Sequence, residues 1–411
     1  MRDIIIVGAG HAGAQAAADL RERGFDGTIM LVGGESHAPY HRPPLSKAFL
    51  KDGGDPPFIK AEAFYPENGI DLRLDQTVVA IDRIASAVHF SDGTEAHYDG
   101  LILTTGASLR HAPVEGADLQ GIHMLRTLED AGWLRERLVE SGRAVIVGGG
   151  FIGLEVAATA RALGVEVTVL ELAPRLMARA VAPQISAHML NVHRDLGSDI
   201  RLGTGLARFH GSGGLLTAVE TGDGEMLETT LAVVGIGVVP NVELAAAAGL
   251  EVTNGIVVDA AMCTTDPKIV AAGDCVAFPY HLSGEMLRLE SVQNAHDQAR
   301  QAVATLLGEP KDYSETPWFW SDQGPVKLQM VGLALDADTD IVRGSPEDGA
   351  FSVFRYVGET LRAVESVNKP GDHMLGRRML SSGFEPSPAE VGDVNHDLKA
   401  AFMTWQKAAR A

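Results

Sequence analysis

Three observations predict an α/β protein of three domains. At the N-terminus an apolar strand is followed by a glycine-rich turn, Gly8–Gly13, and an alanine-rich segment of strong helix formers. The same order recurs around a second turn, Gly148–Gly153. Beyond Pro317 the pattern changes to alternating apolar and polar residues, which is typical of antiparallel strands. The repeated units therefore predict two parallel sheets with helices, and the last segment predicts a separate α+β domain.

The elements of the two repeated units are expected in matching order. In the first unit, Ile4–Val7 and Thr28–Val32 are expected strands and Ala14–Arg23 an expected helix. A short, fully apolar run is typical of a strand buried in a parallel sheet. In the second unit the expected strands are 144–147 and 165–170, and the expected helix is 154–163. The remaining expected elements are strands over 231–239, 269–274, 326–331 and 351–356 and a helical tail over about 388–407.

Bulk composition disfavours several classes of protein. A nucleic-acid binder usually carries a basic footprint, whereas this chain has a formal charge of −20. No apolar run reaches the ~18 residues that a membrane span needs. Met1 leads directly into a strand rather than into a signal peptide. The only cysteines, Cys263 and Cys275, form neither a disulfide framework nor a CxxC motif. We therefore expect a cytoplasmic protein with no nucleic-acid or membrane partner.

Both glycine turns fit the fingerprint of a Rossmann dinucleotide-binding unit, because each lies between an apolar strand and a helix. The first glycine allows a tight turn, the second lets the backbone approach a pyrophosphate, and the third lets the helix pack on the strand. The phosphates then lie at a helix N-terminus, where free N–H groups and the helix dipole favour an anion. The glycines with these roles are Gly8, Gly10 and Gly13 in the first turn and Gly148, Gly150 and Gly153 in the second.

An acidic residue roughly 20 positions after each turn is expected to hold ribose hydroxyls. Glu171 has this place in the second unit, at the end of a strand. Because a glutamate there repels the additional phosphate of NADPH, the second unit is expected to prefer NADH. Glu35 is the candidate in the first unit, and the alternative is an exposed loop carboxylate.

Several motifs identify a resemblance that spans nearly the whole chain. They are Pro39–Lys47 (PYHRPPLSK), Thr104–Ala107, Arg126–Ala131, Gly150–Ala157, Gly237–Asn241, Ala272–Cys275, Glu290–Ala295 and Trp318–Gln323 (WFWSDQ). On these residues the sequence resembles the FAD-dependent ferredoxin reductases of bacterial oxygenase systems, which serve cytochromes P450 and Rieske dioxygenases. The RPPLSK and FWSDQ runs are specific to this group and its near relatives, which include the apoptosis-inducing flavoproteins.

The resemblance implies a glutathione-reductase-like fold with three domains. The FAD domain would comprise 1–109 and 241–316, the NADH domain 110–240, and the C-terminal α+β domain 317–411. The implied FAD-binding residues are Gly8, Gly10, Ala12, Gly13, Glu35, Arg42, Lys47, Val78, Thr105, Gly106, Arg126, Gly273, Asp274, Val292 and Trp320. Relatives usually carry the ribose-binding acid one position before Glu35, where this chain has Gly34.

The resemblance also implies the nicotinamide site and the catalytic residues. The implied NAD-binding residues are Gly148, Gly150, Phe151, Ile152, Gly153, Glu155, Glu171 and Gly237. Lys47 and Glu155 are expected as a pair beside the flavin, where a lysine cation stabilises the negative charge of the reduced ring. Trp320 is expected close to the same ring. Lys47, Glu155 and Trp320 are thus the expected catalytic residues.

Cysteine content narrows the redox chemistry. A disulfide reductase needs a cysteine pair against the flavin and a single-cysteine NADH oxidase needs one, but no cysteine precedes Cys263. Cys275 is expected to be a small buried apolar residue. No cysteine set for an iron–sulfur cluster is present, so an iron–sulfur acceptor must be a separate chain. The expected partner is therefore a [2Fe-2S] ferredoxin, and the expected oligomeric state is a monomer or homodimer.

Some alternatives remain open at the level of sequence. An oxidase or quinone reductase, or a redox-sensing flavoprotein of the apoptosis-inducing type, would share both glycine turns. None of the histidines shows a metal-ligand spacing, and His193 is expected on the surface. Basic residues in the third domain offer two candidate ferredoxin-docking patches, Lys369 with Arg377–Arg378 and Arg355 with Arg362.

Overall fold

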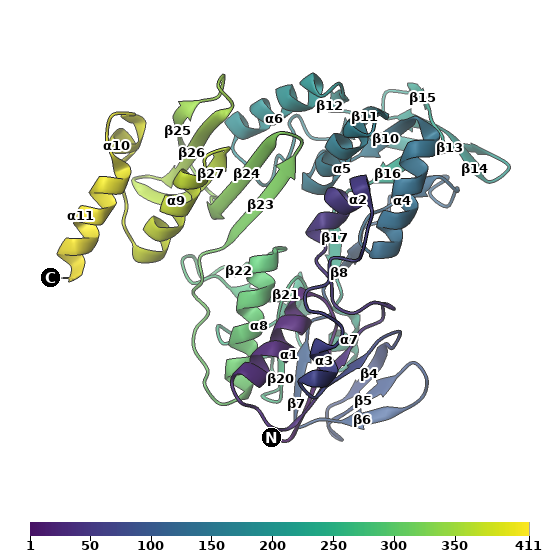
Figure 1. Ribbon diagram of the computed structural model, residues 1–411, viewed down its shortest axis with the longest axis vertical. Helices are drawn as coiled ribbons and strands as arrows, with labels where there is room; N and C mark the ends of the chain where they lie inside the picture. The colour runs from purple at the N-terminus through teal and green to yellow at the C-terminus, as the bar shows by residue number, and fades with distance from the viewer. Residues whose placement is uncertain (411) are drawn as a thin grey trace. The chain divides into compact units, whose positions relative to one another are not determined.

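The computed structural model describes residues 1–410, and its chain divides into two compact units (Figure 1). Unit 1 comprises Met1–His41, Asp55–Ser108 and Val238–Glu315. Unit 2 comprises Arg42–Gly54, Leu109–Gly237 and Thr316 to the C-terminus. No helix within residues 1–410 is both long and apolar enough to cross a membrane.

Unit 1 is built on a five-stranded parallel sheet with the strand order β20-β7-β1-β2-β3. The strands are β1 (Asp3–Val7), β2 (Thr28–Val32), β3 (Ile70–Arg73), β7 (Gly100–Leu103) and β20 (Ile269–Ala271). Helices α1 (His11–Glu22) and α8 (Val292–Leu306) pack side by side (Figure 1). Because Val7 pairs with both Val32 and Leu103, three strands end at one edge of the sheet. The turns that follow those strands therefore meet at that edge.

Smaller elements complete unit 1 around this sheet. An antiparallel sheet joins β4 (Val78–Asp82), β5 (Ala87–Phe90) and β6 (Glu95–His97). A second sheet joins β18 (Val252–Thr253), β19 (Gly255–Val257), β21 (Val276–Pro279) and β22 (Met286–Leu287). The short helices are α3 (Phe64–Glu67) and α7 (Glu243–Ala247), and β8 (Ala107–Leu109) pairs with β17 (Val238–Pro240).

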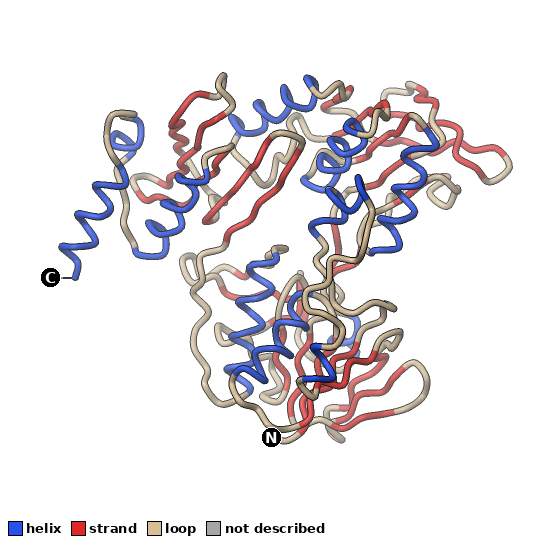
Figure 2. The backbone as a smooth tube through the Cα atoms, viewed as in Figure 1, coloured by secondary structure: helices blue, strands red, loops and turns tan. Residues whose placement is uncertain are grey.

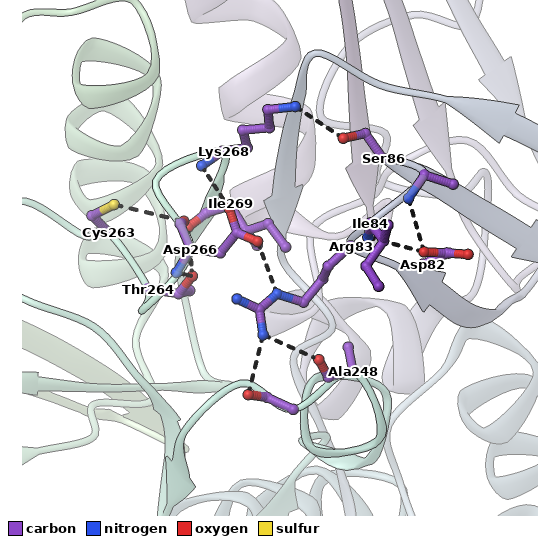
Figure 3. Close-up of polar contacts among 12 residues, drawn as sticks. Asp82, Arg83, Ile84, Ser86, Ala248, Cys263, Thr264, Asp266, Lys268 and Ile269 are labelled. Atoms are coloured by element: carbon purple, nitrogen blue, oxygen red, sulfur yellow. Dashed lines mark hydrogen bonds and ion pairs between the residues drawn. The ribbon is translucent and has the colours of Figure 1, made fainter.

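Arg83 ties three of these segments together (Figure 3). Its Nε donates to Asp266 Oδ2 at 2.8 Å, and its Nη1 donates to the carbonyl oxygens of Ala248 and Gly249 at 3.4 and 3.3 Å. Asp266 lies just before β20, and Lys268 in the same segment donates to Ser86 Oγ at 3.0 Å. The β4–β5 hairpin thereby fixes the approach to β20 and to the turn that follows it.

Unit 2 repeats the parallel design with the strand order β12-β11-β10-β16-β9. The strands are β9 (Ile122–His123), β10 (Arg143–Val147), β11 (Glu166–Glu171), β12 (Asp199–Leu202) and β16 (Ala232–Val234). The helices are α4 (Leu128–Ser141), α5 (Phe151–Ala162) and α6 (Pro183–Asp195), and a side sheet consists of β13 (Leu206–Ser212), β14 (Leu215–Thr221) and β15 (Met226–Glu228). The short helices η1 (Pro43–Ser46) and α2 (Ala48–Asp52) also pack in this unit.

The C-terminal part of unit 2 is an antiparallel sheet, whose strands are drawn in red in Figure 2. Its strand order is β23-β24-β27-β26-β25. Its strands are β23 (Trp318–Gln323), β24 (Val326–Gly332), β25 (Thr339–Ser345), β26 (Ala350–Val357) and β27 (Thr360–Val367). Helices α9 (Pro370–Ser382), α10 (Pro388–Gly392) and α11 (Leu398–Arg410) follow. Its core includes Val331, Phe354, Val364, Met379 and Phe402.

The predicted α/β class, with two parallel units and a C-terminal α+β segment, is confirmed, whereas several element bounds were wrong. The single helical tail is in fact α10 and α11, because Arg343 donates to the backbone oxygens of Val391, Asp393 and His396 and holds the intervening loop. The strand expected over 231–239 breaks after Val234, where Gly235 begins the turn that contains Gly237 at φ +102°. Both glycine-turn helices begin three residues earlier than expected, at His11 and Phe151.

Candidate active site

The first and third glycines of each turn are required by the packing of the protein itself. Gly8 has φ +112°, and a Cβ there would lie 2.2 Å from the carbonyl oxygen of Thr104. A Cβ on Gly13 would lie 1.9 Å from the carbonyl oxygen of Gly8. The second turn repeats this geometry, with Gly148 at φ +113° and a Cβ on Gly153 placed 2.1 Å from the Gly148 oxygen. No side chain fits at these positions without moving backbone.

The second glycine of each turn is not required by packing. A Cβ on Gly10 or Gly150 would meet no heavy atom within 4 Å, and both residues have extended backbone with a negative φ. They are the N-caps of α1 and α5, and neither cap has a side-chain hydrogen bond. Open space in front of uncapped helix N–H groups fits a diphosphate, since a close backbone approach there needs a residue without a side chain. The residues present therefore fit FAD and NADH.

Glu171 lies at the end of β11 and is bound to the second turn. Its Oε2 accepts the Gly149 N–H at 2.7 Å, and its Oε1 accepts the Ala173 N–H at 2.7 Å. The carboxylate thus lies beside the glycine turn, as expected for a group that holds ribose hydroxyls. In unit 1, Glu35 is half-buried and accepts a hydrogen bond from the Tyr40 hydroxyl, so the exposed-loop alternative is wrong.

The other expected FAD residues of unit 1 follow strands of the parallel sheet or lie next to it. Thr105 Oγ1 donates to the Asn241 carbonyl oxygen at 2.7 Å, and Gly106 has φ +67°. Gly273 has φ +89°, and a Cβ there would lie 3.2 Å from the Cβ of Ala12 in α1. The remaining three are Asp274, which is half-buried, Val292, which begins α8, and Val78, which is buried at the start of β4.

The expected residues Arg42, Lys47, Arg126 and Trp320 belong to unit 2. Arg42 Nη1 donates to the Arg126 carbonyl oxygen at 2.6 Å. The Arg126 N–H in turn donates to Asp130 Oδ2 at 2.9 Å, beside the capping box of α4. Trp320 is half-buried on β23, with its ring 5.5 Å from that of Trp318.

The expected pair of Lys47 and Glu155 is formed within unit 2. Lys47 Nζ lies 2.6 Å from Glu155 Oε2, and the Glu155 side chain is only 2% exposed. Ser46 Oγ donates to the same oxygen at 2.5 Å, and Ser321 Oγ donates to Glu155 Oε1 at 2.6 Å. One ammonium and two hydroxyl groups thus satisfy a buried carboxylate, as such a charge requires. Sequence motifs predicted Lys47 and Glu155 but neither Ser46 nor Ser321, although each serine lies in a motif that carried the resemblance.

The expected surface position of His193 was wrong. The residue is fully buried, and its Nε2 lies 2.9 Å from Gln323 Oε1. Burial lowers the pKa of His193, so the ring is neutral near pH 7. The polar residues around it in sequence suggested exposure, but the amphipathic helix α6 turns this position inward, where it meets a strand that is distant in sequence.

Three further histidines of unit 1 lie together near the first glycine turn and were missed. His11 Nε2 lies 3.3 Å from His41 Nδ1, and the ring centroids of His11 and His296 are 5.7 Å apart. Burial lowers the pKa of both His41 and His296. His11 stands inside the glycine motif and His41 inside the PYHRPPLSK run, so their motif positions were the available signal.

Cys275 is fully buried, and burial raises the pKa of its thiol, as expected for an apolar role. Within residues 1–410, no group of three or more His, Cys, Asp or Glu side chains is placed to bind a metal ion. In the candidate docking patch of Arg355 and Arg362, the Arg355 guanidinium is paired with Asp340 and Glu365 at 3.0 Å each. In the other patch, Arg377 lies over the Trp318 ring at 4.6 Å and Arg378 is exposed.

Comparison with known proteins identifies the family of this chain. Residues 2–299 match the family model of pyridine nucleotide-disulphide oxidoreductases, and residues 318–402 match the reductase C-terminal domain. Rhodocoxin reductase from Rhodococcus erythropolis is 46% identical over 401 residues, which are 97% of this chain and 94% of the relative.

Solved structures are similar over nearly the whole chain. The ferredoxin reductase for the CYP199A2 system from Rhodopseudomonas palustris has a TM-score of 0.95 and 46% identity, covering 97% of this chain and 99% of that one. The covalent complex of putidaredoxin reductase with putidaredoxin contains a chain with a TM-score of 0.95 and 41% identity, with 98% of both chains covered. With its two glycine turns and its C-terminal sheet, this chain belongs to the pyridine nucleotide-disulphide oxidoreductase family.

Proposed function

We propose that this protein is an FAD-dependent NADH:ferredoxin oxidoreductase that supplies a cytochrome P450 or a Rieske-type oxygenase. The observation that carries the proposal is the pair of glycine turns, each with open space before a helix N-terminus, in a chain with no cysteine before Cys263. The full-length similarity to a ferredoxin reductase and to a putidaredoxin reductase solved with its putidaredoxin supports the same acceptor class. Both cysteines are free, which suits a cytoplasmic location.

The domains and sites are proposed as the sequence predicts them. Segments 1–109 and 241–316 bind FAD, 110–240 binds NADH, and 317–411 forms the third domain. The residues proposed to hold FAD are Gly8, Gly10, Ala12, Gly13, Glu35, Arg42, Lys47, Val78, Thr105, Gly106, Arg126, Gly273, Asp274, Val292 and Trp320. Gly148–Gly153 with Glu155, Glu171 and Gly237 would hold NADH.

The chain's own groups bind and orient, because hydride transfer needs no protein acid or base at the reacting carbon. Bound FAD supplies the chemistry that accepts two electrons together and releases them singly. Gly150 leaves room for the NADH diphosphate, and Glu171 holds the ribose. Lys47 carries a positive charge whose partner, Glu155, is buried and held by two hydroxyls. One turn and one carboxylate would thus fix the phosphates and the ribose, and the Lys47–Glu155 pair would act at the reacting end.

Cytochrome c reduction tests the proposed function. With NADH and FAD-loaded protein, we expect rapid reduction only when a [2Fe-2S] ferredoxin is added. Rapid NADH oxidation with oxygen or a quinone alone would contradict the proposal and favour an oxidase. Slow flavin reduction with a long-lived charge-transfer band would contradict it in favour of a redox sensor. The same preparation without ferredoxin is the control.

Glu171 is expected to set the preference for NADH. A carboxylate beside the turn repels the 2′-phosphate of NADPH, and such like-charge placement costs several kcal/mol. Glu171→Gln keeps an acceptor oxygen but removes the charge, so the ratio of kcat/KM for NADH over NADPH should fall roughly 10-fold or more. Steady-state kinetics with both nucleotides measures this ratio. An unchanged ratio in a variant with normal thermal stability would remove Glu171 from the ribose site.

A further inference from the structure

Strand β23 contacts the helices of the second glycine-turn unit through every second residue. Phe319 lies 4.8 Å, ring to ring, from Phe151, the first residue of α5. Ser321 donates to Glu155, one helical turn further along α5. Gln323 meets His193 of α6. Because residues of a strand alternate between its faces, Trp318 and Trp320 lie on the opposite face of β23. One face of this strand therefore meets α5 and α6, and the other carries the two tryptophans.

The polar contacts on that face form one buried chain of hydrogen bonds. His193 Nε2 bonds Gln323 Oε1 at 2.9 Å, Gln323 Nε2 donates to Ser321 Oγ at 3.0 Å, and Ser321 Oγ donates to Glu155 Oε1 at 2.6 Å. Ser321, Gln323 and His193 are fully buried and Glu155 is 2% exposed. Since a carbonyl oxygen only accepts, His193 carries its proton on Nε2, and every donor in the chain points toward the carboxylate.

The direction of these hydrogen bonds fixes where the Ser321 proton lies. The serine oxygen already accepts a hydrogen bond from the Gln323 amide, so its only proton is left for Glu155. Glu155 Oε1 is thus occupied by a fixed donor, while Oε2 receives Lys47 and Ser46. Apolar side chains would pack β23 on α5 at a lower desolvation cost than this chain of buried polar groups. Packing alone therefore does not explain the residues found.

We propose that Ser321 and Gln323 are positioning residues for Glu155: they hold its Oε1 so that Oε2 stays turned toward Lys47 and the charge pair is kept. The proposal rests on the proposed function only in that Glu155 acts beside the nicotinamide. The titratable groups that face Glu155 are Lys47, from the η1–α2 segment, and His193, from α6 across Gln323. Strand β23 contributes the hydroxyl and amide groups between them.

The central test is Ser321→Ala, with two measurements of Glu155. Losing a donor to the charged form raises the pKa of a carboxyl group, so Glu155 should bind a proton at higher pH. The first measurement is an NMR titration of protein labelled at the glutamate ¹³Cδ, in which the Glu155→Gln variant assigns the Glu155 signal. The midpoint of the Glu155 transition should move up by about one to two pH units. In stopped-flow reduction by NADH, the acid limb of the pH profile should move in the same direction. Ser321→Thr, which keeps the hydroxyl, should restore both.

A matched control separates positioning from stability. Ser352 is an equally buried serine of the same sheet, bonded to Ser366 Oγ at 3.0 Å and Asp372 Oδ2 at 2.9 Å. Ser352→Ala should leave the Glu155 titration in place even if it lowers the Tm. Gln323→Met keeps Ser321 and is a second test variant. We expect it to move the Glu155 transition upward by less than Ser321→Ala does.

Two results would overturn the proposal. One is a Glu155 titration in Ser321→Ala that superimposes on the wild type. If Ser321→Ala does not fold, an unshifted Glu155 titration in Gln323→Met would overturn the proposal instead. The NMR measurement needs no turnover, so it reports on Ser321 even in a protein that NADH does not reduce. Failure of NADH to reduce the wild-type protein would count against the proposed function and not against this proposal.

Discussion

Gly150→Ala should leave the protein folded and remove most of its affinity for NADH. A Cβ at this position meets no protein atom within 4 Å, and the backbone, with φ −83°, accepts an alanine without strain. The methyl group would instead occupy the space before α5 where a diphosphate has to approach. Forcing atoms into occupied space costs about 1–3 kcal/mol, which is roughly a 5- to 150-fold loss of affinity. Titration with NADH under anaerobic conditions, alongside thermal unfolding, measures both quantities.

Gly153→Ala is the matched control, because its Cβ would lie 2.1 Å from the Gly148 carbonyl oxygen. That variant should lose thermal stability and NADH affinity together. In the first turn, Gly10→Ala should similarly weaken FAD binding without unfolding unit 1, which the yellow colour of the purified protein reports. If Gly150→Ala bound NADH as tightly as the wild type, the open space at the turn would have no role in binding.

The glycine turns were predictable because their chemistry is local. A strand, three spaced glycines and a helix are adjacent in sequence, so the pattern alone indicates which glycine turns the chain and which faces the ligand. Glu171 follows from the same locality, since the end of β11 lies next to β10 in a parallel sheet. The predicted helix starts were wrong because the first turn of each helix contains a glycine, Gly13 in α1 and Gly153 in α5. Glycine lowers the intrinsic helix propensity of these segments, but tertiary packing holds them in the helix.

The environment of Glu155 was predictable only in part because it joins four separate segments. Lys47 and Glu155 were identified through motifs, whereas nothing local indicates that Ser321 donates to the same carboxylate or that His193 lies behind Gln323. Such contacts depend on how β23 packs against α5 and α6, which are far away in sequence. Arg355 is a further case, because nothing local indicates that its charge is paired with Asp340 and Glu365 on neighbouring strands.

Lys47→Ala should slow the reduction of bound flavin by NADH roughly 100-fold or more, because the ammonium group that stabilises the negative charge of the reduced ring is lost. The unpaired Glu155 carboxylate should also lower the stability of the fold by about 3–5 kcal/mol. The Glu155 side chain is 2% exposed, and in the variant the Ser46 and Ser321 hydroxyls would still donate to it without neutralising its charge. Stopped-flow absorbance of the flavin measures the rate. Lys51→Ala is the control, since this lysine lies on α2 four residues away and is exposed.

The double variant Lys47→Ala with Glu155→Gln separates the two contributions of the pair. Removing both charges relieves the unpaired carboxylate, so the Tm should recover toward that of the wild type. The rate of flavin reduction should stay low if the ammonium charge itself is needed when electrons arrive. A rate that recovers together with the Tm would mean that Lys47 acts only by neutralising Glu155, and an unchanged rate in Lys47→Ala alone would remove the pair from the catalytic residues.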